Sequence, residues 1–348
     1  MLRSTFSGFE EAYLYNMSSL LAGSARRSQA RGTSCIEQLS MLFRIRNPRR
    51  RLITAPRRKA NLVFCYAETL WHLSGCCDLD FLEYYAPTMR RLYFTPDTGT
   101  SSAQSTELTG SAHGTRIFNA PHGTASQWDR IVAASREDPE TKRAFLIIAQ
   151  PGEDRSITNP DVACVLGLQF LLRAGRLHAI AYMRAVDAYL GSVSDVFCFT
   201  LLQELLAMQL NVRLGSYAHF MGSYHLYERD FERAASVLSG PRPRGTDDQM
   251  PAMPQCDNWP YVEKVIRLEE KLRNDRVALS ADDIQRTGLP SYWKHVLVIL
   301  ELYRQTRYGL LVNARELLES LPRNYIRMML NRYPPLRHFT ASPEGRIS

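Results

Sequence analysis

The sequence predicts an α/β fold (α+β in the stricter sense) that is large enough to bury a sizeable core. The chain has 348 residues, and 45% of them are hydrophobic. Apolar alternation and short apolar runs predict strands over about 35–55, 143–149, 162–173, 177–186 and 215–227. Longer periodic segments predict helices over about 9–22, 125–137 and 195–211, and another after the basic residues 57–59.

The remaining segments suggest a helical extension after the sheet region. Residues 95–125 are rich in Gly, Ser and Thr, which is typical of a long surface loop. Residues 230–260 are rich in Pro, Arg, Gly and Asp and are expected to form a linker, while 260–332 are mostly helical. We therefore expect a main domain over 1–240 and a helical extension over 241–348 packed on the same domain.

Composition narrows the class of protein. The net charge of +8 suits an anionic partner such as a nucleotide phosphate, although a solvated basic surface explains it equally well. The seven cysteines form no CxxC pair, so neither a disulfide framework nor a metal site is expected, and a reducing cytoplasm is the default. We expect no signal peptide, because the N-terminal segment has no basic stretch followed by an apolar one. We expect no membrane span, because Arg173, Arg176 and His178 interrupt the most apolar window, 162–182.

Cys164 is a candidate nucleophile, although a cysteine in a strand is more often an inert core residue. A reactive thiol needs a lowered pKa, usually from a nearby cation. Arg184 lies at the end of the next strand of the same predicted hairpin, whose turn is 173–175. An arginine at a strand end is commonly a solvated flank, so this pair alone does not establish catalysis.

Other polar residues occupy positions where they have both structural and functional interpretations. His225 and Tyr227 share one face of a strand, which suits a sugar hydroxyl or an ordinary sheet edge. Glu68 lies in an apolar helix, either turned to solvent or buried with a raised pKa. Asp195 precedes a predicted helix and could act as its N-cap.

Taken together, the order and spacing of these residues resemble the thymidylate synthase family. The interval from Cys164 to Arg184 is 20 residues, Asp187 follows after 3, Asp195 after 8 and His225 after 30, as in that family. The resemblance covers about 9–230, so 1–240 is expected to be the catalytic domain. The residues that carry it are Glu68, Trp71, Leu73, Gly75, Asp138, Lys142, Arg143, Cys164, Gln169, Phe170, Arg184, Asp187, Leu190, Gly191, Asp195, Gly222, His225 and Tyr227.

The resemblance implies the thymidylate synthase fold, a large mixed sheet flanked by helices, in a homodimer. It implies 5,10-methylenetetrahydrofolate as cofactor, with Glu68, Trp71, Asp187 and Gly191 near it. Cys164 would attack the pyrimidine, and His225 and Tyr227 would hold the ribose.

The nucleotide phosphate would be bound by several cations. The resemblance assigns Arg184 to it, together with Lys142 and Arg143 from the other subunit. An arginine of the first basic loop completes the set; Arg27 is favoured, with Arg26 and Arg31 as alternatives.

The departures from the family pattern indicate the substrate. The family's Asn that pairs with the uracil edge is Asp195 here, and a carboxylate accepts but does not donate, which favours the cytosine amino group. This change is the mark of the cytidylate (CMP or dCMP) 5-hydroxymethylase branch. In a looser alignment His113 replaces the family's Tyr near the site of proton abstraction. Ala185 and Lys142 replace a Ser and an Arg of the phosphate clamp, a hint of CMP rather than dCMP.

The sequence therefore favours a folate-dependent transferase that adds a hydroxymethyl group to C5 of CMP. In that reaction Cys164 bonds to C6, and Glu68 positions the water that is added. Three alternatives remain: dCMP as substrate, a methylase acting on a pyrimidine nucleotide, and a nucleic-acid-binding protein of the same fold. The chain has no RNA-binding signature that would favour the last.

Overall fold

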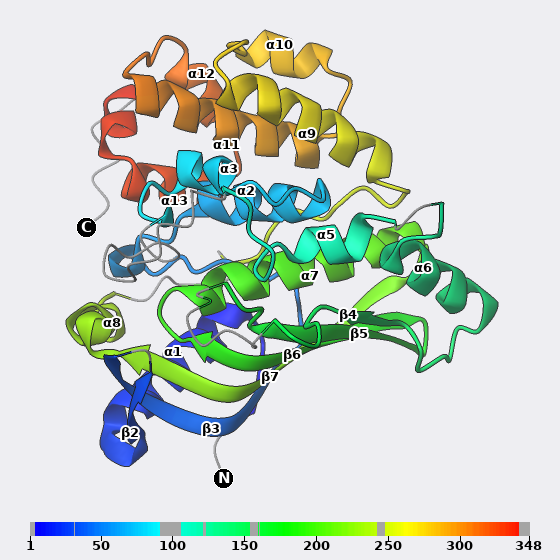
Figure 1. Cartoon of the computed structure of the whole chain (residues 1–348). Coiled ribbons are helices and arrows are strands. Elements are labelled where there is room, and N and C mark those ends of the chain that lie inside the picture. The colour runs from blue at the N-terminus through cyan, green and yellow to red at the C-terminus, as the bar shows by residue number, and fades with distance from the viewer. Residues whose placement is uncertain are drawn as a thin grey trace.

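A seven-stranded mixed sheet forms the centre of the protein (Figure 1). The computed structural model describes residues 4–30, 32–90, 106–120, 123–153, 159, 161–241 and 248–340. The strand order is β1-β3-β7-β6-β5-β4, with β2 paired to β3, and the β1–β3 and β6–β7 pairs are parallel. The strands are β1 (Thr5–Phe6), β2 (Arg26–Ala30), β3 (Thr33–Ile45), β4 (Phe145–Ile147), β5 (Val165–Arg173), β6 (Arg176–Asp187) and β7 (Arg213–Tyr227).

Helices cover one face of this sheet. The α-helices are α1 (Phe9–Ser19), α2 (Leu62–Leu73), α3 (Leu79–Tyr85), α5 (His113–Phe118), α6 (Gln127–Glu137), α7 (Gly191–Gln209), α8 (Phe231–Leu238), α9 (Trp259–Arg273), α10 (Ala281–Arg286), α11 (Ser291–Tyr308), α12 (Ala314–Glu319) and α13 (Arg323–Arg332). A π-helix, η1 (Leu20–Ser24), and the 3-10 helices η2 (Pro56–Arg58), η4 (Glu228–Asp230) and η5 (Pro334–Phe339) complete the described elements.

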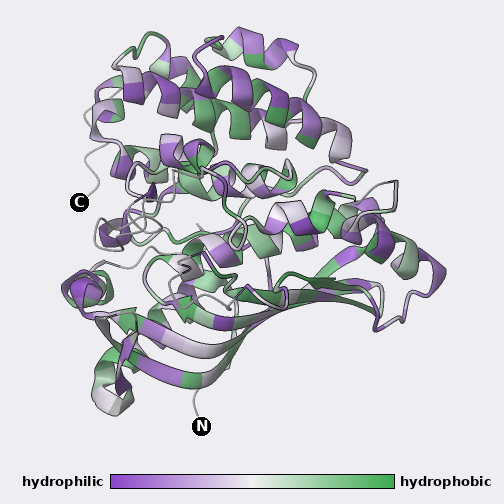
Figure 2. Ribbon diagram, viewed as in Figure 1, coloured by the Kyte–Doolittle hydropathy of each residue, from purple (hydrophilic) through white to green (hydrophobic). Residues whose placement is uncertain are grey.

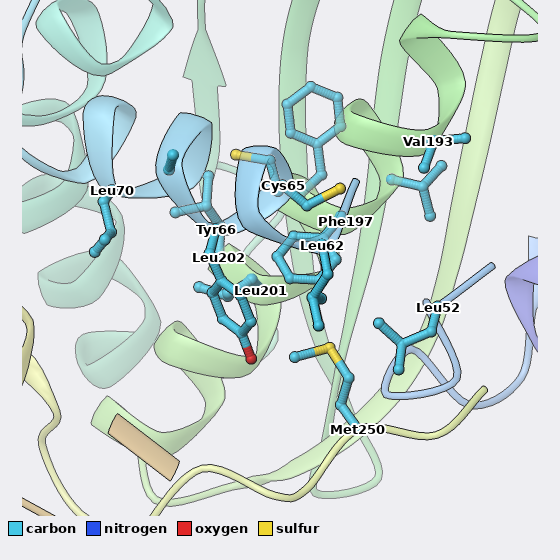
Figure 3. Close-up of a cluster of buried hydrophobic side chains, with 14 of the residues drawn as sticks. Leu52, Leu62, Cys65, Tyr66, Leu70, Val193, Phe197, Leu201, Leu202 and Met250 are labelled. Atoms are coloured by element: carbon cyan, nitrogen blue, oxygen red, sulfur yellow. The ribbon is translucent and has the colours of Figure 1, made fainter. Parts of the chain in front are cut away.

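Helix α7 is the central helix of the core. It packs on β6 and β7, and α2 packs on its other side. Figure 3 shows this contact, where Leu62 and Tyr66 of α2 lie near Phe197 and Leu201 of α7. By length and composition α7 is apolar enough to cross a membrane, but 78% of that window is buried inside the fold. Its apolar character is therefore explained by its place between the sheet and α2.

The C-terminal helices pack against α2 and share its core. The hydroxyls of Tyr66 on α2 and Tyr325 on α13 lie 2.8 Å apart, and both side chains are buried. Glu204 of α7 pairs with the fully buried Arg51 and also accepts from the backbone nitrogen of Met253 at 3.1 Å. The residues before and after position 240 are thus in extensive contact with each other. The division of the chain at that position stays a prediction.

The opposite face of the sheet carries no helix in the described part of the chain (Figure 1). Buried and more exposed positions alternate along much of the strands, and hydrophobic as well as hydrophilic stretches lie on the sheet (Figure 2), so the open face is also apolar in places. Ile147 is 61% exposed, Leu42 44% and Phe220 38%. Tyr182 lies between Phe145 and Phe220, with ring centroids 5.9 Å and 6.5 Å away. A row of large side chains therefore crosses this face.

The predicted fold class is confirmed, and most predicted elements are present. The turn between β5 and β6 is formed by Ala174 and Gly175, whose φ angles of 49° and 68° suit a two-residue hairpin. Helix α6 begins at the predicted place, where Ser126 and Asp129 form a capping box.

Several details of the expected elements were wrong. The first basic loop contains β2, because it pairs along β3, while 46–55 form no strand. The expected loop over 95–125 contains α5 in its described part, and 91–105 lie outside the described residues. The expected linker contains α8. Asp195 is not an N-cap, because α7 already begins at Gly191 and its N-cap is Leu190.

Candidate active site

The predicted site residues gather where several strand ends meet. Cys164 immediately precedes β5, and its carbonyl oxygen accepts a hydrogen bond from the backbone nitrogen of Arg184 on β6 at 2.9 Å. Because β6 and β7 are parallel, Asp187 and His225 are direct neighbours near their carboxyl ends. On the other side of β7, Glu37 of β3 is paired with His225. The predicted nucleophile Cys164 and the pair His225 and Tyr227 thus lie at the same end of the sheet.

Arg184 is held against the chain that leads into Cys164. Its Nε donates to the carbonyl of Ala163 at 2.9 Å and its Nη2 to that of Val162 at 3.0 Å. Both Cys164 and Arg184 are exposed. The guanidinium is thus fixed beside the backbone that leads into Cys164, where it can also bind a phosphate oxygen.

His225 and Tyr227 form a single polar surface on β7. Their ring centroids lie 5.0 Å apart at 81°. Burial lowers the pKa of His225, and the nearby carboxylates of Asp187 and Glu37 partly oppose this effect. The neutral imidazole that results has one donor and one acceptor, which suits a sugar hydroxyl.

Arg27 approaches this surface from the edge hairpin. Its Nη1 lies 2.9 Å from Oε1 of Glu228, which directly follows Tyr227, and its side chain is 80% exposed. Arg26 is also on β2, paired with Glu37, whereas Arg31 lies outside the described residues. An exposed arginine that contacts the residue after Tyr227 is in a position to reach an anion bound there.

Lys142 and Arg143 lie at the other end of the sheet within the same chain. They precede β4, whose first residue Phe145 pairs with Gln169, well along β5 from Cys164. The amide of Gln169 donates to the carbonyl of Lys142 at 3.1 Å. Both cations are exposed. A single chain does not bring this pair to its own Cys164.

Three carboxyl groups approach one another above the sheet. Burial raises the pKa of Glu68 to about 7, opposed by a hydrogen bond from Ser194. Burial, with the charges of Glu68 and Asp187, raises the pKa of Asp195 well above its usual range. Burial also raises the pKa of Asp187. Burial therefore raises the pKa of all three carboxyl groups above that of exposed ones.

Gly191 separates two of these carboxyl groups. A methyl group built on it would lie 3.7 Å from Cβ of Asp187 and 3.7 Å from Oδ2 of Asp195. The Asp187 carboxylate accepts from the backbone nitrogens of Tyr189 at 2.8 Å and Leu190 at 3.1 Å. These bonds fix the turn that enters α7 and so orient Asp187 relative to Asp195.

His113 begins α5 and is stacked on His72 of α2. The two ring centroids lie 4.9 Å apart and the rings are nearly parallel, at 8°. Burial, and secondarily the charge of Arg116, lowers the pKa of His113 to about 3. Its Nδ1 is buried and has no hydrogen-bond partner among the described residues. His113 is therefore a neutral imidazole with an unsatisfied polar atom.

A family model for thymidylate synthase matches residues 11–252. The chain belongs to the thymidylate synthase family. The matched segment contains the whole sheet except β1 and every predicted site residue. Helices α9 to α13 lie beyond it.

The chain is similar to two relatives within the thymidylate synthase family. It is 30% identical over 248 residues to the deoxyuridylate hydroxymethyltransferase of Bacillus phage SP01, covering 65% of this chain and 60% of that protein. It is 31% identical over 123 residues to a putative thymidylate synthase of Methanocaldococcus jannaschii, covering 34% of this chain and 55% of that protein. The chain thus matches less than two thirds of the length of either relative.

Not every residue taken from the thymidylate synthase pattern fits a direct contact with a ligand. Trp71 is only 1% exposed, and its indole Nε1 donates to the carbonyl of Asp78 at 3.0 Å. The expectation that Trp71 borders the cofactor does not agree with this burial. Ala185 is half-buried on β6 beside Ser223, and Val165, after the nucleophile, is fully buried.

Sequence reasoning missed residues that complete the site. Ser194 bonds to Glu68, and Oγ of Ser223 donates to Oε2 of Glu37 at 2.7 Å. Neither interaction follows from spacing along one element, because each joins two elements far apart in sequence. Among the described residues no group of three or more His, Cys, Asp or Glu side chains is arranged to hold a metal ion.

Proposed function

We propose that this protein is a folate-dependent transferase that installs a hydroxymethyl group at C5 of CMP. The observation that carries the proposal is Asp195, which stands where the family pattern has an Asn and whose pKa is raised well above the usual range. A protonated carboxyl group has one donor and one acceptor. It can donate to N3 of cytosine and accept from the N4 amino group.

Protonated Asp195 would also activate the ring. A hydrogen bond to N3 withdraws electron density from the pyrimidine, so attack at C6 becomes easier. Uracil carries a hydrogen on N3 and an acceptor at position 4, so it gains no such activation at N3. A protonated carboxyl can also pair with the uracil edge, by donating to O4 and accepting from N3–H, so the two bases are expected to differ mainly in the rate of attack at C6.

Cys164 is assigned the role of nucleophile. Its thiolate adds to C6, which makes C5 nucleophilic, and it leaves when the C5 product is complete. Arg184 and Arg27 would bind the phosphate, since guanidinium groups suit a dianion. His225 and Tyr227 would hold the ribose hydroxyls. These groups fix the base relative to the thiol and so lower the entropic part of the barrier.

The carboxyl groups around Gly191 suit a reduced folate. The pterin ring offers N–H donors, and Asp187 supplies acceptor oxygens beside Gly191, which has no side chain to fill the space. When bound, 5,10-methylenetetrahydrofolate supplies the one-carbon unit. The residues assigned to it are Asp187, Gly191 and Glu68.

Glu68 and His113 are assigned the handling of water. Glu68, with a pKa of about 7, can accept a proton from water at neutral pH and return it. His113 is neutral, so it would orient a water molecule by hydrogen bonding, and that water takes the C5 proton to solvent. Addition of water, rather than of a hydride, makes the product a hydroxymethyl group.

A second copy of the chain is the proposed partner. The open face of the sheet exposes Phe220, Leu42 and Ile147, and burying these side chains between two copies would stabilise a dimer. Lys142 and Arg143 lie too far along β5 to serve their own site. In such a dimer they would reach the phosphate of the other subunit.

A second candidate substrate is deoxyuridylate, because a relative of 30% identity carries that name. The substitution of the family's phosphate-clamp residues by Ala185 and Lys142 favours a ribonucleotide instead. The chain also resembles the CMP hydroxymethylase of mildiomycin-type nucleoside antibiotic biosynthesis, and we propose that kind of pathway, in the cytoplasm, as its setting.

Competition among nucleotides tests the proposed substrate. The protein is incubated with 5,10-methylenetetrahydrofolate and equal amounts of CMP, dCMP, UMP and dUMP. The nucleotides are then separated, and their masses are measured by mass spectrometry. A gain of mass mainly on CMP is expected. A gain mainly on dCMP would overturn the argument from Ala185 and Lys142, and one on dUMP the argument from Asp195. No product on any of them would favour a nucleic-acid-binding protein.

A further inference from the structure

A buried carboxylate holds the turn that precedes His113. Asp161 is 8% exposed. Its Oδ2 accepts from the backbone nitrogens of Thr109 at 2.6 Å and Gly110 at 2.8 Å, and its Oδ1 accepts from that of Ser111 at 2.7 Å. Three short bonds from consecutive amides to one charged group form a strong anchor, because hydrogen bonds to an ionised acceptor are about twice as strong as neutral ones.

The anchor brings two chain segments into direct contact near the nucleophile. A methyl group on Gly110 would collide with the carbonyl oxygen of Asp161 and lie 3.0 Å from the backbone nitrogen of Ala163. Ala163 is the residue before Cys164. Only a glycine permits this approach, so the turn is pressed against the backbone that enters the nucleophile.

The same turn sets the position of His113. The carbonyl of Ser111 accepts from the backbone nitrogen of His113 at 2.9 Å, and α5 begins there. On the far side, Nδ1 of His72 accepts from the backbone nitrogen of Gly114 at 3.3 Å. His113 is therefore fixed between the turn held by Asp161 and the imidazole of His72.

We propose that Asp161 is a positioning residue that holds His113 at a fixed position relative to Cys164. The inference rests on the proposed function, because it assigns His113 to the water that removes the C5 proton. Asp161 itself would touch neither substrate nor cofactor. Its carboxylate oxygens already accept hydrogen bonds from the three backbone amides, so Asp161 acts through the geometry of the turn.

A double-mutant cycle on the full-length protein tests the proposal. In Asp161→Asn the new NH2 group cannot accept, so at least one of the three amides loses its partner. A small displacement of an orienting group is expected to lower kcat about 10- to 100-fold, with the KM for CMP unchanged. In a His113→Phe background the same change is expected to have no further effect, since both act on one step. Additive losses would overturn the proposal.

A matched control separates this effect from loss of a carboxylate in general. Asp283 also accepts from a backbone nitrogen, that of Ser280 at 3.0 Å, but lies on α10. Asp283→Asn is expected to leave kcat unchanged. If it lowers kcat as much as Asp161→Asn does, the positional argument is wrong.

Hydrogen exchange keeps the test independent of the proposed substrate. The amides of Thr109, Gly110 and Ser111 are expected to exchange faster in Asp161→Asn than in the unsubstituted protein, without any nucleotide. Unchanged exchange would overturn the anchor, whereas faster exchange in a protein without nucleotide activity would point to a failure of the proposed function alone. Should Asp161→Asn not fold, Gly110→Ala displaces the same turn and is expected to lower kcat in the same way.

Discussion

The carboxyl of Glu68 on α2 raises the pKa of the Asp195 carboxyl on α7. Burial is the larger cause, and the nearby charges of Glu68 and Asp187 add to it. Two acids at the contact of two core helices thus have environments that oppose ionisation. This arrangement lets one fold supply a hydrogen-bond donor to a base and a proton acceptor to water at the same pH.

Replacing Glu68 is expected to stabilise the protein at high pH and to impair it as a catalyst. The folded pKa is about 7 against 4.5 for the exposed group, so the folded state binds the proton more tightly and stability falls as pH rises through that interval. Glu68→Gln removes this dependence. Its Tm should therefore exceed that of the unsubstituted protein increasingly as pH rises, measured by thermal unfolding over a pH series.

The same variant is expected to lose about 100-fold or more of the hydroxymethylating rate, because an amide cannot accept the proton. A pH-independent difference in Tm between the two proteins would contradict the assigned pKa. Glu270→Gln, at a carboxyl with no place in the site, is a suitable control on α9.

Asp195→Asn is expected to shift base preference toward uracil. An amide cannot supply the mobile proton that favours N3 of cytosine, and it suits the uracil edge that the family's Asn recognises. The ratio of kcat/KM for CMP to that for UMP should fall by a factor of tens or more. An unchanged ratio would show that Asp195 does not read the base.

Arg27→Ala is expected to raise the KM for CMP while leaving Tm nearly unchanged. The Arg27–Glu228 ion pair is largely exposed, so it contributes little to stability. Loss of one charge-assisted contact with phosphate is expected to raise KM about tenfold. Arg286→Ala, which removes another exposed arginine from α10, is the control and should change neither quantity. Equal effects on CMP and on cytidine would show that Arg27 does not bind phosphate.

Phe220→Glu is expected to weaken the proposed dimer. Phe220 lies on the open face of the sheet, 6.5 Å from the ring of Tyr182, and a buried carboxylate without a partner is strongly disfavoured. Sedimentation should show monomers at concentrations where the unsubstituted protein is dimeric. Val312→Glu adds the same charge at a residue that is 87% exposed in the helical extension, and it should leave the dimer intact. A variant that stays dimeric would place the interface elsewhere.

The sequence was most informative where a residue type has one dominant local use. Ala174 and Gly175 formed the predicted hairpin turn, and the fixed spacing of Cys164, Arg184 and His225 placed all three at one end of the sheet. The hydrophobic period and the spacing of polar residues are properties of one chain segment, so they predict which strand ends carry polar groups.

Interactions between distant segments could not be predicted in this way. The prediction that Asp195 is an N-cap was wrong. Helix α7 begins about one helical turn earlier, at Gly191, directly after the loop whose backbone is bound by the Asp187 carboxylate. The role of Asp161 does not follow from its local sequence, since its three partners are backbone amides about 50 residues away. Trp71 matches the family motif, but its side chain is 1% exposed and packs in the core, which its place in the motif does not reveal.

The most direct test of the central claim is the mass of the product formed from CMP. The purified protein is incubated with CMP and 5,10-methylenetetrahydrofolate, beside Cys164→Ala, whose change lies at an exposed position and should leave the fold intact. The account predicts that CMP gains one CH2O unit, and that Cys164→Ala yields none of this product. A gain of one CH2 unit would identify a methylase, and a product that survives in Cys164→Ala would contradict the assigned nucleophile.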